Sequence, residues 1–552
     1  MSSLSVKTIL QQANTKKVVA GVALLFILGF YSPVFEMTLS PVYGAAASHI
    51  FHGYGVGVVA GCGWLLKDHV RRLSNRRAVY LLPALAFWVP SIQYFVTQGS
   101  SSLGNPTGPV ITELFTFYPL VLFTVACAGK LLQLGLKLQP HGDIVSEHVP
   151  LLGSYIIYSA GDHFAKAFLS KFLGTTFLLS RCGLQFLVGV FYAAVIPSKW
   201  LVLAIPSILF SLTSDVHLPL GHTTAVLNSA LQEEGYALLA RQDSNTGYIS
   251  VLENMHDGFR VMRCDHSLLG GQWTKMPANY HPAVKDPIYA VFAMLEAIRL
   301  VETDSGEARA DANTRALVVG LGVGTTPAAL INHGIETTIV EIDPVVHKFA
   351  AEYFELPSNH IAAIEDATTF VKRAQSSLES AKYDYIVHDV FTGGAEPLEL
   401  FTIEFLRDLD SLLKHDGVIA INFAGDLSLY PAALTVRTIR AVFPSCRFFR
   451  EDAVAEGHVD FTNMVVFCKK TATPVQFRDP VRADFLSSKS RENYLVPKHE
   501  VDPSIFDHIE KGGKKVLRAK ETGLLHKYQD RSALAHWQIM RNVLPDAVWE
   551  NW

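Results

Sequence analysis

Long apolar segments occupy the first 213 residues of the chain, whereas shorter, interrupted ones occupy the rest. The first begins at Val18, and others lie near residues 48–66, 79–96, 110–132, 150–170, 177–196 and 200–213. Several reach the roughly 18 to 20 residues that a helix needs to cross a bilayer core. The pattern predicts an α-helical multi-pass membrane domain over residues 18–213, with five to seven spans.

Basic residues are concentrated in alternate loops of this region. Residues 67–77 contain five Lys and Arg side chains, whereas the next loop, 97–109, contains none. Because basic loops tend to stay in the cytosol, we expect the N-terminal segment 1–17 and the loop 130–149 to be cytosolic as well. A nucleoside cofactor is supplied in the cytosol, which favours six crossings and therefore a cytosolic soluble domain. A signal peptide is the rival interpretation of the first segment, and we rank it lower because further apolar segments follow.

The pattern changes after residue 213. A polar linker with some helical character over residues 214–245 precedes two short alternating runs, which are typical of a β-hairpin. A stretch with helical spacing follows at 286–302, so we assign residues 246–302 to a small β domain with a connecting helix. Residues 303–315 are hydrophilic and predict a second linker.

Strand-like and helix-like segments alternate from residue 316 to about residue 472. This order predicts a Rossmann-like α/β domain over residues 316–472, built on a doubly wound, parallel sheet. The tail over residues 473–552 is charged and mixed in composition, and the sequence assigns it no role.

The first strand of the α/β domain leads into a glycine turn. Gly320, Gly322 and Gly324 follow the strand, and the next strand ends at Glu341. Glycines let a backbone approach a ligand closely, and an acid about twenty residues further on can accept hydrogen bonds from ribose hydroxyls. The spacing predicts a nucleoside site. The alternative is an ordinary turn in which the glycines serve packing alone.

Two further acids, Asp366 and Asp389, follow the next two predicted strands. Ligands bind at the carboxyl ends of the strands of an open parallel sheet. We therefore expect Asp366 to accept a hydrogen bond from an adenine amino group. We expect Asp389 to lie nearest the reacting atoms, where it could hold or deprotonate a nucleophile. Helix N-capping is the alternative role for each acid.

Composition narrows the partners of the protein. The formal charge of −4 gives no signature of nucleic-acid binding, so we expect no nucleic-acid partner. The six cysteines include no CxxC pair, so they suggest neither a disulfide framework nor a zinc site. We therefore expect no metal, and a reducing compartment for the soluble part.

The succession of motifs GLGVGTT, VEIDPVV, EDATTFV and YDYIVHDVF is fairly specific. With these motifs, residues 245–470 resemble the spermidine/spermine synthase family, aminopropyltransferases with a methyltransferase-type Rossmann fold. Together with the apolar N-terminal region, the chain is similar to the membrane-fused branch of that family. The resemblance implies aminopropyl transfer from decarboxylated S-adenosylmethionine to an amine. It also implies that Asp389 is catalytic and that Tyr248 and Asp265 line the acceptor pocket.

The chain departs from the family where the polyamine would bind. Val323 replaces an aspartate of the glycine turn, Thr392 replaces the second aspartate of the catalytic strand, and the stretch VFAML (291–295) lacks an acid. A polyamine carries several charges and needs carboxylate partners once it leaves water. The nucleoside half of the site is thus intact, and the polyamine half is depleted.

The main hypothesis is a membrane-anchored transferase that uses decarboxylated S-adenosylmethionine or S-adenosylmethionine itself. Its partners are the lipid bilayer and a small-molecule acceptor, and we leave a homodimer open. Methyl transfer from S-adenosylmethionine to an unknown, hydrophobic acceptor is the alternative, favoured by the missing acids. A membrane sensor that binds the nucleoside without turnover is a further alternative, and transport by the apolar helices is a third.

Overall fold

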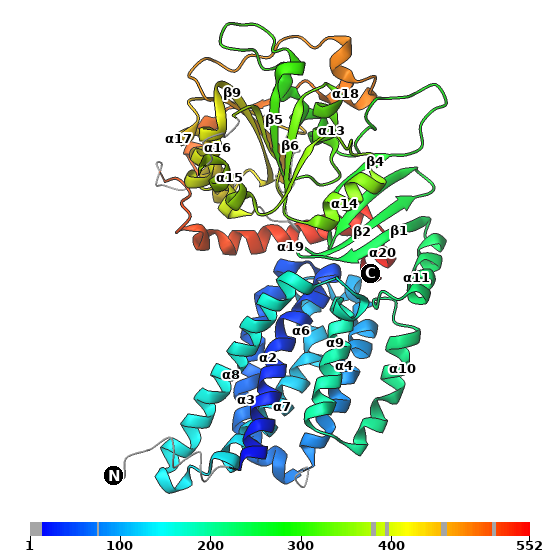
Figure 1. Cartoon of the computed structure of the whole chain (residues 1–552), viewed down its shortest axis with the longest axis vertical. Coiled ribbons are helices and arrows are strands. Elements are labelled where there is room, and N and C mark those ends of the chain that lie inside the picture. The colour runs from blue at the N-terminus through cyan, green and yellow to red at the C-terminus, as the bar shows by residue number, and fades with distance from the viewer. Residues whose placement is uncertain (1–13, 74–76, 377–381, 392–396, 454–460, 510–514) are drawn as a thin grey trace. The chain divides into compact units, whose positions relative to one another are not determined.

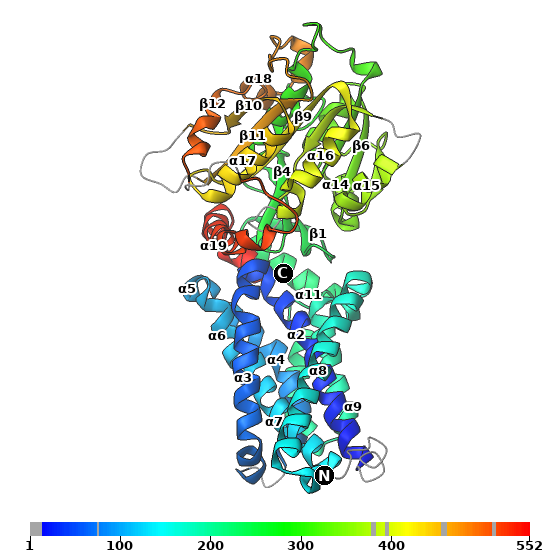
Figure 2. The ribbon, with the colours of Figure 1, turned by 90° about the vertical axis from the view of Figure 1, so that its left-hand side faces the viewer.

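The computed structural model describes residues 14–73, 77–376, 382–391, 397–453, 461–509 and 515–552. These residues form two compact units (Figure 1 and Figure 2). The helical unit consists of Met1–Glu234 together with Arg541–Trp552, and the α/β unit consists of Gly235–Met540.

The predicted helical region is confirmed. Among the described residues, three helices are long and apolar enough to cross a membrane, judged by length and composition alone: Thr15–Tyr43 (α2), Ala78–Thr97, which ends in α4 (Leu82–Thr97), and Phe117–Leu136 (α7). The other helices of the unit are α3 (Ala45–Leu73), α5 (Ser100–Leu103), α6 (Thr107–Phe115), α8 (Asp143–Phe172), α9 (Arg181–Val195), α10 (Ile205–Thr213), α11 (Gly221–Glu233) and α20 (Asp546–Glu550).

The chain enters the helical bundle at the end where the basic loops lie. Just before α2, the backbone N–H of Asn14 donates to the carbonyl of Gly135 near the end of α7, over 2.8 Å. Lys130 of the same helix pairs with Asp68 of α3 over 2.6 Å. The start of α2, the end of α3 and the end of α7 therefore share one end of the bundle.

The chain leaves the bundle at the other end. Thr38, near the C-terminus of α2, bonds Gln93 of α4 over 3.2 Å. The next residue, Tyr94, lies with its ring 5.1 Å from that of His217, which follows α10. Because α2 has 29 residues, it is about 44 Å long. Its two ends are thus far apart, and the chain crosses the bundle an odd number of times.

A small antiparallel sheet begins the α/β unit. Its strands pair in the order β1 (Tyr236–Asp243), β2 (Tyr248–Asn254), β3 (Phe259–Cys264) and β4 (Ser267–Trp273), and β2 with β3 forms the predicted hairpin. The predicted linker 214–245 contains α11, which agrees with its helical character, and also β1, which was not predicted. The predicted helix 286–302 is shorter than expected: Pro287 bridges Gln272 in extended form, so α12 covers only Ala290–Leu295 and a 3₁₀ turn follows at Glu296–Leu300.

The larger sheet confirms the Rossmann-like prediction. Its strand order is β12-β10-β11-β9-β8-β5-β6-β7, with parallel pairing from β9 to β7 and antiparallel pairing from β9 to β12. The antiparallel edge includes β12, which comes from the tail. The strands are β5 (Arg315–Val319), β6 (Glu336–Glu341), β7 (Ile361–Ile364), β8 (Tyr383–His388), β9 (Leu413–Asp426), β10 (Ser445–Arg450), β11 (Phe461–Lys469) and β12 (His499–Val501).

Alternating side chains of the central strands pack on both faces of this sheet. Leu317 and Ile419 belong to a core with α16 (Ile403–Leu412) and α17 (Tyr430–Val442), whereas Val318 and Ala420 belong to a core with α12 and α13 (Thr325–Asn332). Period-two burial on both faces is what a doubly wound sheet requires. The helices of the unit beyond α12 are α13 (Thr325–Asn332), α14 (Pro344–Tyr353), α15 (Ala367–Ser376), α16 (Ile403–Leu412), α17 (Tyr430–Val442), α18 (Lys489–Tyr494) and α19 (His526–Val543), which runs on into the helical unit.

One cysteine pair contradicts the expectation that the cysteines form no disulfide. Cys446 of β10 and Cys468 of β11 are register partners and are joined by a disulfide. The two are 22 residues apart in sequence, and antiparallel pairing brings them together. Spacing along the chain gives no signal for such a pair, because the two cysteines meet only through strand pairing.

Candidate active site

The glycine turn between β5 and α13 packs so closely against neighbouring backbone that it leaves no room for a side chain. Gly320 and Gly322 have φ values of 91° and 54°. A Cβ atom on Gly320 would lie 1.9 Å from the carbonyl oxygen of Asp389, and one on Gly322 would lie 2.5 Å from that of Leu269. Both the backbone conformation and the close approach therefore require glycine.

Glu341 ends β6 directly beside this turn. Its Oε2 accepts from the backbone N–H of Leu321 over 3.1 Å, and its Oε1 accepts from that of Asp343 over 2.8 Å. Burial raises the pKa of Glu341 to about 7, and these backbone hydrogen bonds oppose the rise. Each oxygen has a second lone pair for a hydroxyl donor. The turn and the acid thus fit the ribose of a nucleoside.

Asp366 precedes α15 and caps it. Its Oδ1 accepts from the backbone N–H of Thr369 over 3.0 Å and from the hydroxyl of Thr368. Burial raises the pKa of Asp366, but the hydrogen bonds from these threonines outweigh it and leave the pKa below its usual value. The N-capping alternative therefore applies to Asp366, and its adenine role stays a prediction.

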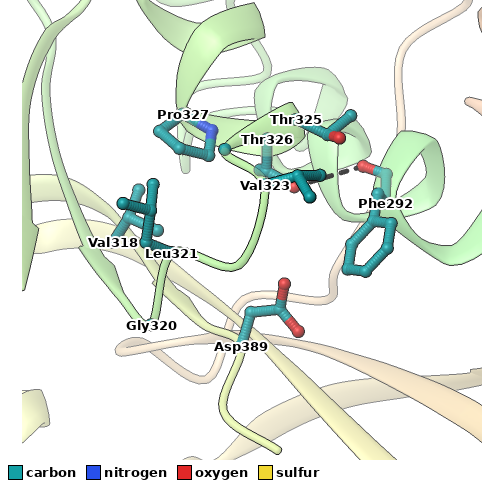
Figure 3. Close-up of a pocket in the computed structure, with 10 residues that line it drawn as sticks. Phe292, Val318, Gly320, Leu321, Val323, Thr325, Thr326, Pro327 and Asp389 are labelled. Atoms are coloured by element: carbon teal, nitrogen blue, oxygen red, sulfur yellow. Dashed lines mark hydrogen bonds between the residues drawn. The ribbon is translucent and has the colours of Figure 1, made fainter. Parts of the chain in front are cut away.

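Asp389 follows β8 and faces the glycine turn. It lines one pocket with residues from β5, the turn, the start of α13 and α12 (Figure 3), namely Phe292, Val318, Gly320, Leu321, Val323, Gly324, Thr325, Thr326 and Pro327. Burial raises the pKa of Asp389 to about 6, and a hydrogen bond from Asn422 opposes the rise. A carboxylate with such a pKa can accept a proton near neutral pH.

Two residues of this site escaped sequence reasoning. Asn422 on β9 donates from Nδ2 to Oδ1 of Asp389 over 2.9 Å. Phe292 of α12 lines the pocket, and its carbonyl accepts from the hydroxyl of Thr326 over 3.2 Å. Asn422 could have been found, because it lies in the strand after Asp389, at the same carboxyl edge. Phe292 gives no such signal, since it lies in an ordinary apolar stretch.

The residues predicted to line the acceptor pocket support the small sheet. Oδ1 of Asp265 accepts from the backbone N–H of Tyr248 over 2.8 Å, and Asp265 occupies the turn between β3 and β4 with a φ of 48°. The Tyr248 ring packs beside Arg263, 5.4 Å away. Neither residue lines the pocket of Asp389. Val323 does line it, and Thr392 lies outside the described residues.

The chain is similar to some known proteins in its α/β part alone and to another along its whole length. A model of the spermine/spermidine synthase domain matches residues 303–448. A polyamine aminopropyltransferase of Vibrio vulnificus is 34% identical over 32% of this chain and 56% of its own length. A probable spermidine synthase structure from Corynebacterium glutamicum is 15% identical, with a TM-score of 0.39 over 51% of this chain and 96% of that one.

One relative matches along the whole chain. It is a protein of Emericella nidulans named N-terminal histidine N-methyltransferase, 64% identical over 99% of both chains. The chain belongs to the N-terminal histidine N-methyltransferase family. The spermidine synthase resemblance is therefore correct for the domain and wrong for the whole protein.

Membership of this family corrects the predicted reaction. Aminopropyl transfer is wrong, because the full-length relative is a methyltransferase by name and the aminopropyltransferases match only part of the chain. The protein is a transferase, and S-adenosylmethionine is the co-substrate that the family supports. Nothing in the family supports the decarboxylated form.

Proposed function

We propose that this protein transfers the methyl group of S-adenosylmethionine to a nitrogen of the N-terminal histidine of a protein substrate. The observation that carries the proposal is the 64% identity to a named N-terminal histidine N-methyltransferase over the full length of both chains. The aligned residues cover the helical unit as well as the α/β unit. The pocket beside the glycine turn and Asp389 supplies the chemistry that such a reaction needs.

The chain's own residues have three tasks in this reaction. The glycine turn and Glu341 hold the nucleoside, and S-adenosylmethionine supplies a methyl group already activated by its sulfonium. Asp389 lies at the turn, so it can orient the acceptor nitrogen toward that methyl. A new N–C bond forms as the S–C bond breaks, and the acceptor loses a proton. With a pKa of about 6, Asp389 can take this proton at neutral pH.

A peptide assay tests the function directly. The full-length protein in detergent is incubated with S-adenosylmethionine and a peptide that begins with histidine, and the methylated residue is located by fragmentation mass spectrometry. Methylation of the first residue and release of S-adenosylhomocysteine are expected. The matched control peptide has one alanine placed before the histidine, and it should stay unmodified. Equal methylation of both peptides, or of neither, would overturn the proposal.

We further propose that the helical unit spans a bilayer and that the α/β unit lies on the non-cytosolic side. Lys67, Arg71 and Arg72 of the basic loop 67–77 belong to the last turns of α3, at the entry end of the bundle, and the chain leaves at the opposite end, at His217. With basic loops in the cytosol, the α/β unit follows on the other side. The disulfide between Cys446 and Cys468 supports this side, since disulfides persist in oxidising compartments.

The proposed substrate agrees with this topology. Translation begins with methionine, so an N-terminal histidine has to be exposed by proteolysis, as happens when a signal peptide is removed. Protease protection in sealed microsomes tests the arrangement. A tag after Trp552 should survive protease without detergent and be digested with it. Digestion of the tag in sealed vesicles would show instead that the α/β unit lies in the cytosol.

A further inference from the structure

The amide of Asn422 has one hydrogen-bonding atom that no described residue uses. Its Nδ2 donates to Asp389, and because an ionised carboxylate only accepts, this bond fixes which end of the amide faces the acid. The opposite atom, Oδ1, is buried, and no donor among the described residues reaches it. The Asn422 residue is only 6% exposed. A buried acceptor without a donor is uncommon and points to a ligand group that supplies one.

An aromatic group lies at the same edge of the sheet. Phe391 follows Asp389 by two residues, about 7 Å along an extended chain. Its ring centroid is 5.3 Å from that of His536 on α19, and the Phe461 ring is 6.3 Å from the same histidine. Phe461 pairs with the last residue of β9, the strand that also carries Asn422. We call Phe391, Phe461 and His536 the aromatic group.

The histidine of this group is a neutral ring. Its Nε2 lies 3.1 Å from the hydroxyl of Ser267 on β4. Burial lowers the pKa of His536 to about 4, so the ring is uncharged at neutral pH. An uncharged histidine in contact with two phenylalanines favours a planar ring as its neighbour, through edge-to-face or offset stacking.

We propose that Asn422 and the aromatic group form the acceptor subsite, which holds the N-terminal histidine of the substrate beside Asp389. This inference rests on the proposed function. Oδ1 of Asn422 accepts a hydrogen bond from an N–H of the substrate, and the aromatic group packs against its imidazole. The tail helix α19 is then a specificity element, a role that its charged and mixed sequence did not reveal.

Binding of histidinamide tests the subsite without turnover. The probe is titrated into the full-length protein in detergent, saturated with S-adenosylhomocysteine. Asn422→Leu keeps the branched shape of the side chain and removes the amide, and His536→Ala removes the ring. Each should weaken histidinamide binding by about tenfold or more, the size of one lost hydrogen bond or ring contact. Both variants should keep the affinity of the parent protein for S-adenosylhomocysteine.

Two further variants separate a specific role of α19 from a structural one. His536→Phe keeps an aromatic ring and should largely restore binding. Met540→Ala is the matched control, because Met540 lies one turn further along α19, is also 6% exposed and is not in the aromatic group. It should bind histidinamide like the parent protein. An equal loss in Met540→Ala, or a parallel loss of S-adenosylhomocysteine affinity, would overturn the subsite.

The outcomes also distinguish this inference from the proposed function. If the parent protein methylates peptides that begin with histidine, and both Asn422→Leu and His536→Ala leave their KM unchanged, the subsite is wrong and the function stands. If the parent protein binds histidinamide through these residues but methylates no such peptide, the function is wrong and the subsite stands. A parent protein that does not bind histidinamide at all overturns the subsite.

Discussion

The substitution Glu341→Gln should stabilise the empty protein at pH 8 and weaken its binding of S-adenosylmethionine. Burial raises the pKa of Glu341 from 4.5 to about 7. Between these two values the folded state keeps a proton that the unfolded state releases, so the stability from this group falls as the pH rises. At about 1.4 kcal/mol for each pKa unit, the ionised carboxylate costs about 3 kcal/mol above pH 7.

Glutamine removes this cost but cannot reproduce both hydrogen bonds of the carboxylate. Leu321 and Asp343 each donate a backbone N–H to Glu341, and the amide group of glutamine accepts only at its oxygen. Losing one acceptor costs about 1 kcal/mol. The net gain at pH 8 is therefore about 2 kcal/mol. At pH 5, about half a unit above the ordinary pKa of 4.5, keeping the parent carboxyl protonated costs only about 0.7 kcal/mol. This nearly offsets the lost acceptor, so the two proteins should differ little in stability there.

Hydrogen exchange read by mass spectrometry measures this change in the full-length protein. Peptides covering β5 and β6 are compared between parent and variant at the same pH, so that the intrinsic exchange rate cancels. Glu341→Gln should slow their exchange at pH 8 and change it little at pH 5. Its affinity for S-adenosylmethionine should fall by about tenfold or more, because hydrogen bonds to a charged acceptor are lost.

Asp366→Asn is the matched control at the end of the next strand. The pKa of Asp366 is lowered rather than raised, so its ionised form contributes stability above the usual aspartate pKa and loses it as the pH falls. Asparagine also caps helices well, so this variant should gain nothing at pH 8. Unchanged or faster exchange of Glu341→Gln at pH 8 would refute the reasoning, because the buried carboxylate would then carry no cost.

Three other predictions test the site and the fold. In single-turnover assays, Asp389→Asn should lower kcat by about 10²- to 10⁴-fold, while its affinity for S-adenosylmethionine, measured by calorimetry, should be unchanged. The kcat of the parent protein should decrease as the pH is lowered below about 6, because Asp389 is then protonated. Gly320→Ala should abolish S-adenosylmethionine binding, because the new Cβ would lie 1.9 Å from the carbonyl oxygen of Asp389. Gly334 is the control, since its φ is 86° but nothing lies within 4 Å of a Cβ there. Gly334→Ala should lower the stability by only about 1–2 kcal/mol in denaturant melts. Replacing Cys446 and Cys468 by serine should cost about 3 kcal/mol in the same melts, and a reductant should then have no further effect.

The sequence predicted the nucleoside half of the site because that half depends on local spacing. Gly320, Gly322 and Glu341 belong to one strand–turn–helix–strand unit, and the parallel pairing of β5 with β6 brings them together. Asp389 followed from the same rule, since it ends the strand on the other side of β5. Each of these residues lies at the end of an apolar strand, where its position could be read from the hydrophobic pattern.

The rest of the unit depends on pairing between distant segments. Cys446 meets Cys468 through antiparallel strands, and β12 joins the sheet from a tail that had no assigned role. His536 lies against Ser267 although the two are far apart in sequence. Contacts of this kind have no periodic signal, so no hydrophobic pattern could predict them.

The departures from the polyamine synthase pattern have a physical explanation in the acceptor. A polyamine requires several carboxylates, because each buried ammonium needs a charged partner. In this pocket Val323 stands where one such acid is expected, and it is packed against Gly270 and buried at 4% exposure. The acid that lines this pocket, Asp389, is partnered by an amide, Asn422, instead of a second acid. One carboxylate and one amide suit an acceptor that has few polar atoms and a planar ring. The histidine side chain has both properties. The residues that weakened the first interpretation of the reaction thus support methyl transfer to an imidazole-bearing N-terminus.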